Sequence, residues 1–122
     1  MMVKTAKKLN KLAREIFEIS SEKGFWDIPE ISDFAIVPIK LALIGDEVSE
    51  ALKVHRDEYK DGVESLLHYM TPEQATEFTE ELADIVIRTL DLAGGLALPI
   101  GESIAEKIEK NKLRPNKHNK RY

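Results

Sequence analysis

Four carboxylates stand in two pairs with the same spacing, and they are the residues of this chain that point most directly at chemistry. Glu47 and Glu50 form one i,i+3 pair, and Glu81 and Asp84 form the other. If both segments are helices, each helix presents two acids from one face, one turn apart. Mg²⁺ prefers oxygen ligands and commonly combines a few carboxylates with the phosphates of a substrate. The spacing therefore allows a four-carboxylate metal site between two helices, with two ordinary solvated helix faces as the alternative.

Length and composition indicate a single domain over residues 1–122, without disulfides or thiolate metal sites, because the chain has 122 residues and no cysteine. The N-terminal segment is charged throughout and has no apolar run long enough for a signal peptide or a membrane span. A cytoplasmic protein with no membrane partner is therefore expected. The net charge is −4, yet residues 107–122 carry seven Lys or Arg against the single acid Glu109. This basic C-terminal tail, from about residue 114, could bind nucleic acid or meet a polyanion at a cation site.

Hydrophobic periodicity indicates helix over almost the whole chain. The expected helices run from Thr5 to about Ser21, from Asp33 to about Arg56, from Thr71 to about Gly94, and from Pro99 to Leu113. Pro38 falls early in the second of these, so that helix could instead start at Val37 or later. Residues 57–70 have a weak pattern, with room for a short helical piece at Glu64–His68. The sequence therefore predicts an all-α domain whose four main helices pack as a bundle.

The start of the third helix has the clearest local pattern. Thr71 suits the N-cap position, Pro72 the first helical position, and Gln74 can close a capping box. At the other end, Gly94 and Gly95 supply a C-terminal stop.

The acids differ in how far they interrupt apolar faces. Glu47 lies on an apolar stripe of the second helix, whereas Glu50 borders the solvent-facing side. The third helix has a wide apolar arc, which suggests several neighbouring helices or a second subunit, and a narrow polar strip. That strip consists of Glu77, Glu81, Asp84, Arg88 and Asp91. It could be a wet edge where Asp84, Arg88 and Asp91 form ordinary surface ion pairs.

Four sequence segments, in the same order along the chain, resemble those of a known family. They are GFWD, LALIGDEVSEALKVHRD with Asp46-Glu47-x-x-Glu50, ELADIVIRTLDLAG with Glu81-x-x-Asp84, and KIEKNKLRPNKH near the C-terminus. Together they resemble the MazG-like all-α nucleoside triphosphate pyrophosphohydrolases, over most of the chain. Asp46 stands where that family usually has its first Glu, the spacer from Ala51 to Glu80 is long, and the histidine of the tail is not followed by the usual glycine.

The resemblance implies Mg²⁺-dependent hydrolysis of a (deoxy)nucleoside triphosphate between its α- and β-phosphates, with Mn²⁺ as a substitute metal. It implies that Glu47, Glu50, Glu81 and Asp84 hold the metal. Glu47 is the favoured general base, because desolvation in an apolar stripe would raise its pKa, and Asp46 is the competing candidate. It also implies a homodimer or a dimer of dimers.

Substrate-binding candidates lie outside the acidic motifs. Lys107, Asn111 and Arg114 share one face of the fourth helix, where a lysine and an arginine suit phosphate binding. The alternative is a solvated helix end whose cations meet the C-terminal dipole. Trp26 could stack on a nucleobase, and packing in the core or in a subunit interface is an equal explanation for it.

Several other functions compete with this one. Within the same superfamily, dUTP or dUDP hydrolases and phosphoribosyl-ATP pyrophosphatases are the nearest alternatives. A ferritin-like di-iron site needs Glu-x-x-His pairs, which the three histidines do not form. The acidic body offers no basic surface to accompany the tail, so a nucleic-acid partner is not expected. A non-enzymatic helical interaction module would show no dependence on metal or nucleotide.

Overall fold

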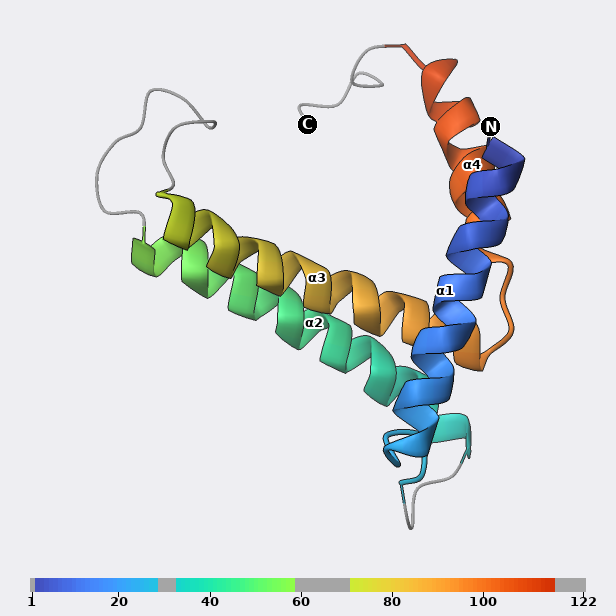
Figure 1. Cartoon of the computed structure of the whole chain (residues 1–122), viewed down its shortest axis with the longest axis horizontal. Coiled ribbons are helices and arrows are strands. Elements are labelled where there is room, and N and C mark those ends of the chain that lie inside the picture. Colours follow the sequence, from blue (N-terminus) through green and yellow to red (C-terminus); the bar gives the residue numbers. More distant parts are fainter. Residues whose placement is uncertain (1, 29–32, 59–70, 116–122) are drawn as a thin grey trace.

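Over residues 2–28, 33–58 and 71–115, which the computed structural model describes, the chain forms four α-helices and no strand (Figure 1). They are α1 (Met2–Glu22), α2 (Asp33–Glu58), α3 (Pro72–Gly95) and α4 (Ile100–Lys112). The predicted all-α fold is confirmed. The expected helical piece at Glu64–His68 and the tail beyond residue 115 lie outside the described residues.

The helices pack against one another in a bundle-like arrangement, in which α3 contacts both α1 and α2. In Figure 1, α2 and α3 lie side by side along most of their length, and α1 crosses α3 near its C-terminal end. α4 packs against α1. The hairpin of α2 and α3 therefore positions the two acidic motifs, while α1 closes one end of it.

Helix boundaries follow local rules closely. The Thr71 hydroxyl accepts a hydrogen bond from the backbone N–H of Gln74 at 3.2 Å, and the Gln74 side chain accepts one from the Thr71 N–H at 2.8 Å. This is the predicted capping box. α2 begins at Asp33 and contains Pro38, so the later start at Val37 is not observed. α1 begins before the expected Thr5.

Three glycines allow the helices to approach closely. A Cβ at Gly94 would overlap the carbonyl oxygen of Ala13, and one at Gly101 would overlap that of Ala6. At Gly95 a Cβ would overlap the ring of Trp26. α3 does end at Gly95, as predicted, but neither glycine there has a positive φ. They are needed because α1 and Trp26 pack directly on the backbone of α3.

The N-terminus of α4 is capped by a residue of α1. Pro99 occupies the N-cap position and has no side-chain cap, so the first amides of α4 need another acceptor. The Asn10 side-chain oxygen accepts a hydrogen bond from Gly101 N–H at 2.8 Å, and its amide nitrogen donates to both carboxylate oxygens of Glu102 at 3.0 and 2.7 Å. These bonds to Glu102 lower the pKa of its carboxyl group. Asn10 therefore fixes where α4 docks.

The interior of the single chain is small. The buried apolar residues are Ala6, Ala13, Ala51, Leu90, Leu92 and Ala93, and none of the large side chains described is fully buried. α2 carries an exposed apolar stripe at heptad-like spacing, formed by Phe34, Leu41, Val48 and Leu52. No described helix combines the length and hydropathy needed to cross a bilayer.

Candidate metal and phosphate site

Three of the four predicted metal ligands meet between α2 and α3. Glu47, Glu81 and Asp84 each have a carboxylate oxygen that lies within 4.8 Å of the other two. Oxygens bound to one Mg²⁺ are about 4 Å apart or less, because each Mg–O bond is about 2.1 Å long. Small side-chain rotations would therefore bring these oxygens onto a single ion. Glu47 and Glu81 are half-buried, and Asp84 is exposed.

The other two predicted acids of α2 lie apart from this cluster. Glu50 and Asp46 are both exposed, and in the described part of the chain neither has an oxygen in the three-carboxylate group. Glu50 is near enough to act electrostatically on Glu81. The structure therefore separates Glu47 from Glu50, although both occupy the same motif.

The pKa of the Glu81 carboxyl group is affected by the acids that surround it. Its pKa is raised from the ordinary value of 4.5, first by desolvation and then by the negative charges of Asp84, Glu47, Glu50 and Glu77. The part of this shift that follows desolvation reflects the negative charge gathered around Glu81. A bound cation would relieve it, which agrees with the spacing of the oxygens.

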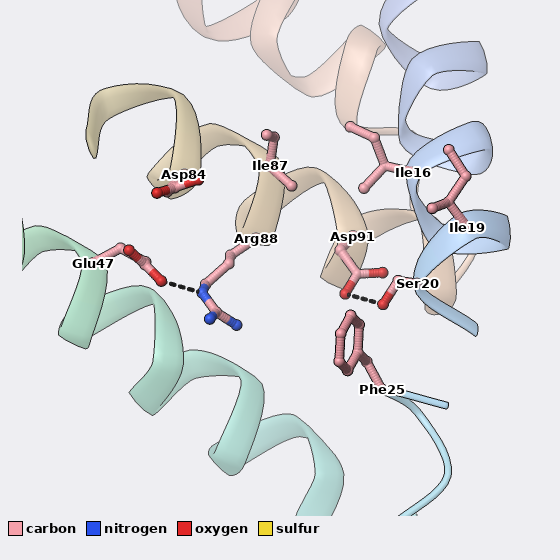
Figure 2. A pocket seen from close by; sticks show the side chains of 9 residues that line it. All are labelled: Ile16, Ile19, Ser20, Phe25, Glu47, Asp84, Ile87, Arg88 and Asp91. Atoms are coloured by element: carbon pink, nitrogen blue, oxygen red, sulfur yellow. Dashed lines mark hydrogen bonds and ion pairs between the residues drawn. The ribbon is translucent and has the colours of Figure 1, made fainter. Parts of the chain in front are cut away.

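Arg88 supplies a positive charge to Glu47 across the two helices. Its Nε lies 2.6 Å from Oε1 of Glu47, and the side chains are 40% and 16% exposed, respectively. Figure 2 shows the two side chains pointing toward each other, with Asp84 one turn along α3 from Arg88. The alternative in which Arg88 pairs with acids of its own helix is wrong, because the position of α2 brings Glu47 closer.

A cavity of about 500 Å³ adjoins this ion pair. It is lined by Ile16, Ile19, Ser20, Phe25, Glu47, Asp84, Ile87, Arg88 and Asp91 (Figure 2). One wall is mostly apolar and comes from α1 and the loop after it, while the other carries the charged residues of α2 and α3. Phe25, which is 64% exposed, is the aromatic residue of this wall. Its place beside Trp26 is the one signal in the sequence that could have pointed to it.

Trp26 lies among packed side chains. Its indole N–H donates to Oδ1 of Asp91 at 2.9 Å, and its ring meets the edge of Phe17 with the ring centres 5.1 Å apart. The Lys40 ammonium lies 4.6 Å from the centre of the indole ring. Trp26 does not line the cavity described above. These contacts agree with the alternative that Trp26 packs in the protein interior. The aromatic ring beside the charged residues of the cavity is that of Phe25.

A buried ion pair supports the loop that carries Phe25. Lys40 and Asp91 are 5% and 7% exposed, so the expectation that Asp91 belongs to a wet edge is wrong. Lys40 Nζ lies 3.6 Å from Asp91 and donates to the carbonyl oxygen of Phe25 at 2.8 Å, while Ser20 donates to Asp91 at 3.0 Å. Sequence reasoning missed Lys40, because a single lysine in an apolar stripe gives no sign of its partner.

The predicted basic face of α4 is distant from the acids in the fold. Lys107, Asn111 and Arg114 are all exposed, and none of them lines the cavity. α4 packs on α1, and Figure 1 shows its C-terminal end rising away from the hairpin of α2 and α3. Within one chain, the structure does not bring these three residues to the carboxylates.

Comparisons with known proteins add no family to this geometry. The chain matches no model of a known protein family, no curated protein and no solved structure. The likeness to the MazG-like enzymes therefore depends on the four ordered sequence segments, and the site is described by its own residues: three converging carboxylates, one arginine and a cavity beside them.

Proposed function

We propose that this chain is a Mg²⁺-dependent nucleoside triphosphate pyrophosphohydrolase of the MazG-like type. It would hydrolyse its substrate between the α- and β-phosphates and release a nucleoside monophosphate and pyrophosphate. The observation that carries the proposal is the convergence of Glu47, Glu81 and Asp84 within 4.8 Å, at the edge of a cavity of about 500 Å³. The order of the sequence motifs supports the same chemistry.

Each group of residues has a defined task in this proposal. Glu47, Glu81 and Asp84 would hold the cation, and Glu50 would need to turn inward to join them. When bound, such a cation neutralises charge on phosphate oxygens and orients the attacking water. Glu47 and Asp46 remain the two candidates for accepting the proton of that water.

The cavity suits the remainder of a nucleotide. Its apolar wall offers Phe25 and neighbouring isoleucines, on which a base can pack, and its opposite wall carries the acids. The buried Lys40–Asp91 pair holds Phe25 from behind, through the hydrogen bond to its carbonyl oxygen. A base near Phe25 would leave the phosphates facing the carboxylates and their cation.

A panel of nucleoside triphosphates tests the activity directly. Pyrophosphate release is measured with Mg²⁺ and with a chelator, and dUTP and phosphoribosyl-ATP are included to separate the alternative substrates. Asp84→Asn should reduce turnover on the order of 100-fold, since it removes a metal contact. Glu50→Gln should also reduce turnover, because the proposal has Glu50 turn inward to join the cation. Glu109→Gln, on the exposed surface of α4, is the matched control. No turnover of any triphosphate, or full turnover in both site variants, would overturn the proposal.

We also propose that a second copy of the chain covers the exposed stripe of α2. Phe34, Leu41, Val48 and Leu52 are between 42% and 90% exposed in the single chain. Large contiguous apolar surfaces commonly mark subunit contacts, and the small interior of one chain leaves these side chains without cover. A homodimer would bury them. The same stripe would suit a different helical partner if the chain were an interaction module, so the size of the purified protein distinguishes the two.

A further inference from the structure

Arg88 is the basic residue in the wall of the cavity. Among the nine lining residues, the charged ones are Glu47, Asp84, Arg88 and Asp91. Asp91 already has the buried ammonium of Lys40, together with hydrogen bonds from Ser20 and Trp26. Arg88 is therefore the cavity-lining cation that remains for the other two acids and for any ligand.

Most of the guanidinium is available to a ligand. In the part of the chain that the structure describes, Nε is the guanidinium nitrogen with a hydrogen-bond partner, Glu47. A guanidinium has five N–H donors in a planar fork, and the four on the terminal nitrogens are unused here. Figure 2 shows these nitrogens directed toward the space between α2 and Phe25. A phosphate group has the charge and the geometry that such a fork binds.

Arg88 and a divalent cation would compete for the carboxylate of Glu47. Oε1 of Glu47 accepts the Arg88 hydrogen bond at 2.6 Å, and Glu47 is also one of the three converging carboxylates. A cation at those carboxylates would repel the guanidinium and draw electron density from Glu47, which weakens the ion pair. The phosphates of a substrate would offer the guanidinium a replacement partner.

We propose that Arg88 is the phosphate-binding residue of this site, held by Glu47 in the free protein and transferred to a substrate phosphate when cation and substrate bind. This role rests on the proposed function. It gives the site an internal counter-ion that keeps Glu47 and Arg88 in place before the substrate arrives. In this proposal Arg88, and not Lys107 or Arg114, is the residue that contacts the phosphate within one chain.

A purely structural ion pair between α2 and α3 makes a different prediction. If Arg88 only joined the helices, its removal would lower stability and leave the binding of a polyphosphate unchanged. If Arg88 competes for Glu47 and binds phosphate, its removal strengthens the binding of a cation alone and weakens the binding of a polyphosphate. The two effects have opposite signs, so a general loss of structure cannot produce both.

Titration calorimetry on Arg88→Gln tests this, with Mn²⁺ alone and then with inorganic pyrophosphate in the presence of Mg²⁺. Mn²⁺ should bind about two- to fivefold tighter, the effect of removing one partly exposed ion pair. Pyrophosphate should bind about tenfold weaker, the effect of one charge-assisted hydrogen bond. Arg88→Lys should retain part of the pyrophosphate affinity, since it keeps the charge without the fork. Arg14→Gln, an exposed arginine on α1, is the control for charge alone.

The outcomes separate this inference from the proposed function. Wild-type protein that binds Mn²⁺ and hydrolyses a triphosphate, with Arg88→Gln unchanged in both affinities, overturns the role of Arg88 only. Weaker Mn²⁺ binding in Arg88→Gln also overturns it and leaves the structural ion pair. A wild-type protein that binds no Mn²⁺ overturns both proposals. Thermal unfolding of each variant confirms that the compared proteins are folded.

Discussion

The ammonium of Lys40 on α2 lies 3.6 Å from the carboxylate of Asp91 on α3, and only 6% and 11% of these side chains are exposed. Within the described residues, the other side-chain hydrogen bonds of the pair lead to the N-terminal part of the chain. Asp91 receives hydrogen bonds from Ser20 and Trp26, and Lys40 donates to the carbonyl oxygen of Phe25. The pair therefore ties α1 and the loop after it to the hairpin of α2 and α3, directly behind the cavity.

Asp91→Asn should destabilise the fold by about 3 kcal/mol, because it leaves the ammonium of Lys40 buried without a counter-charge. Urea unfolding at pH 7 measures the change. Glu15→Gln is the control, since it removes an exposed ion pair with Lys11 and should cost less than about 1 kcal/mol. The double change Lys40→Met with Asp91→Asn should recover part of the loss. Equal, small losses for the Asp91 and Glu15 variants would show that the buried pair contributes little.

Asn10→Ala should weaken the docking of α4 on α1, because it removes the cap of the Gly101 amide, worth about 1 kcal/mol. It should also let the pKa of Glu102 rise toward its ordinary value of 4.5. Because the pKa of Glu102 is lower in the folded state, this carboxylate stabilises the fold at pH values above its ordinary pKa. That contribution is lost as the pH falls through the pKa that Glu102 has in the folded state. The variant should therefore show a smaller loss of stability under acid than the wild type.

Carboxyl NMR titration of Glu102 and urea unfolding from pH 2 to 6 measure both effects. Asn111→Ala, in the exposed last turn of α4, serves as the control. If the Glu102 titration is the same in wild type and in Asn10→Ala, the hydrogen bonds from Asn10 do not hold this carboxylate.

Glu81→Gln should make the metal-free protein more stable at neutral pH. The pKa of Glu81 is raised in the folded state by desolvation and by neighbouring acids, so the wild type loses stability as the pH rises above 4.5 through the folded value. Glutamine has no charge and escapes this loss. Thermal unfolding with a chelator should give a higher Tm for the variant at pH 7 and a negligible difference at pH 4. Glu106→Gln, exposed on α4, is the control, and a lower Tm for the Glu81 variant at pH 7 would contradict the prediction.

Leu41→Glu should dissociate the proposed homodimer, because it places a charge in the exposed stripe of α2, where Leu41 is 55% exposed. Light scattering after size-exclusion chromatography should give twice the chain mass for wild type and the chain mass for the variant. Leu113→Glu makes the same change at a leucine that is 88% exposed beyond α4, and it should leave the dimer intact. A wild type that is monomeric at high concentration would exclude the dimer.

Local rules in the sequence determined where the helices lie. The periodic apolar residues, the capping box of Thr71 with Gln74 and the glycines at the end of α3 predicted helices that the structure contains. These features depend on residues within a few positions of one another. The i,i+3 spacing likewise placed Glu81 and Asp84 on one face of α3. The predicted start of α2 at Asp33 is also observed, and the alternative start at Val37 is not, because Pro38 is tolerated inside the second turn.

Only the tertiary structure decided which side chains meet. It joined Glu47 to Glu81 and Asp84 while leaving Glu50 exposed, and it gave Arg88 a partner on another helix. It also buried Asp91, which the helical pattern had put with the solvent-facing residues. Periodicity fixes the angle of a residue about its own helix axis, but the rotation of one helix against another depends on packing between distant segments. Here the contacts of α1, Trp26 and Lys40 set that packing, and no local pattern contains them.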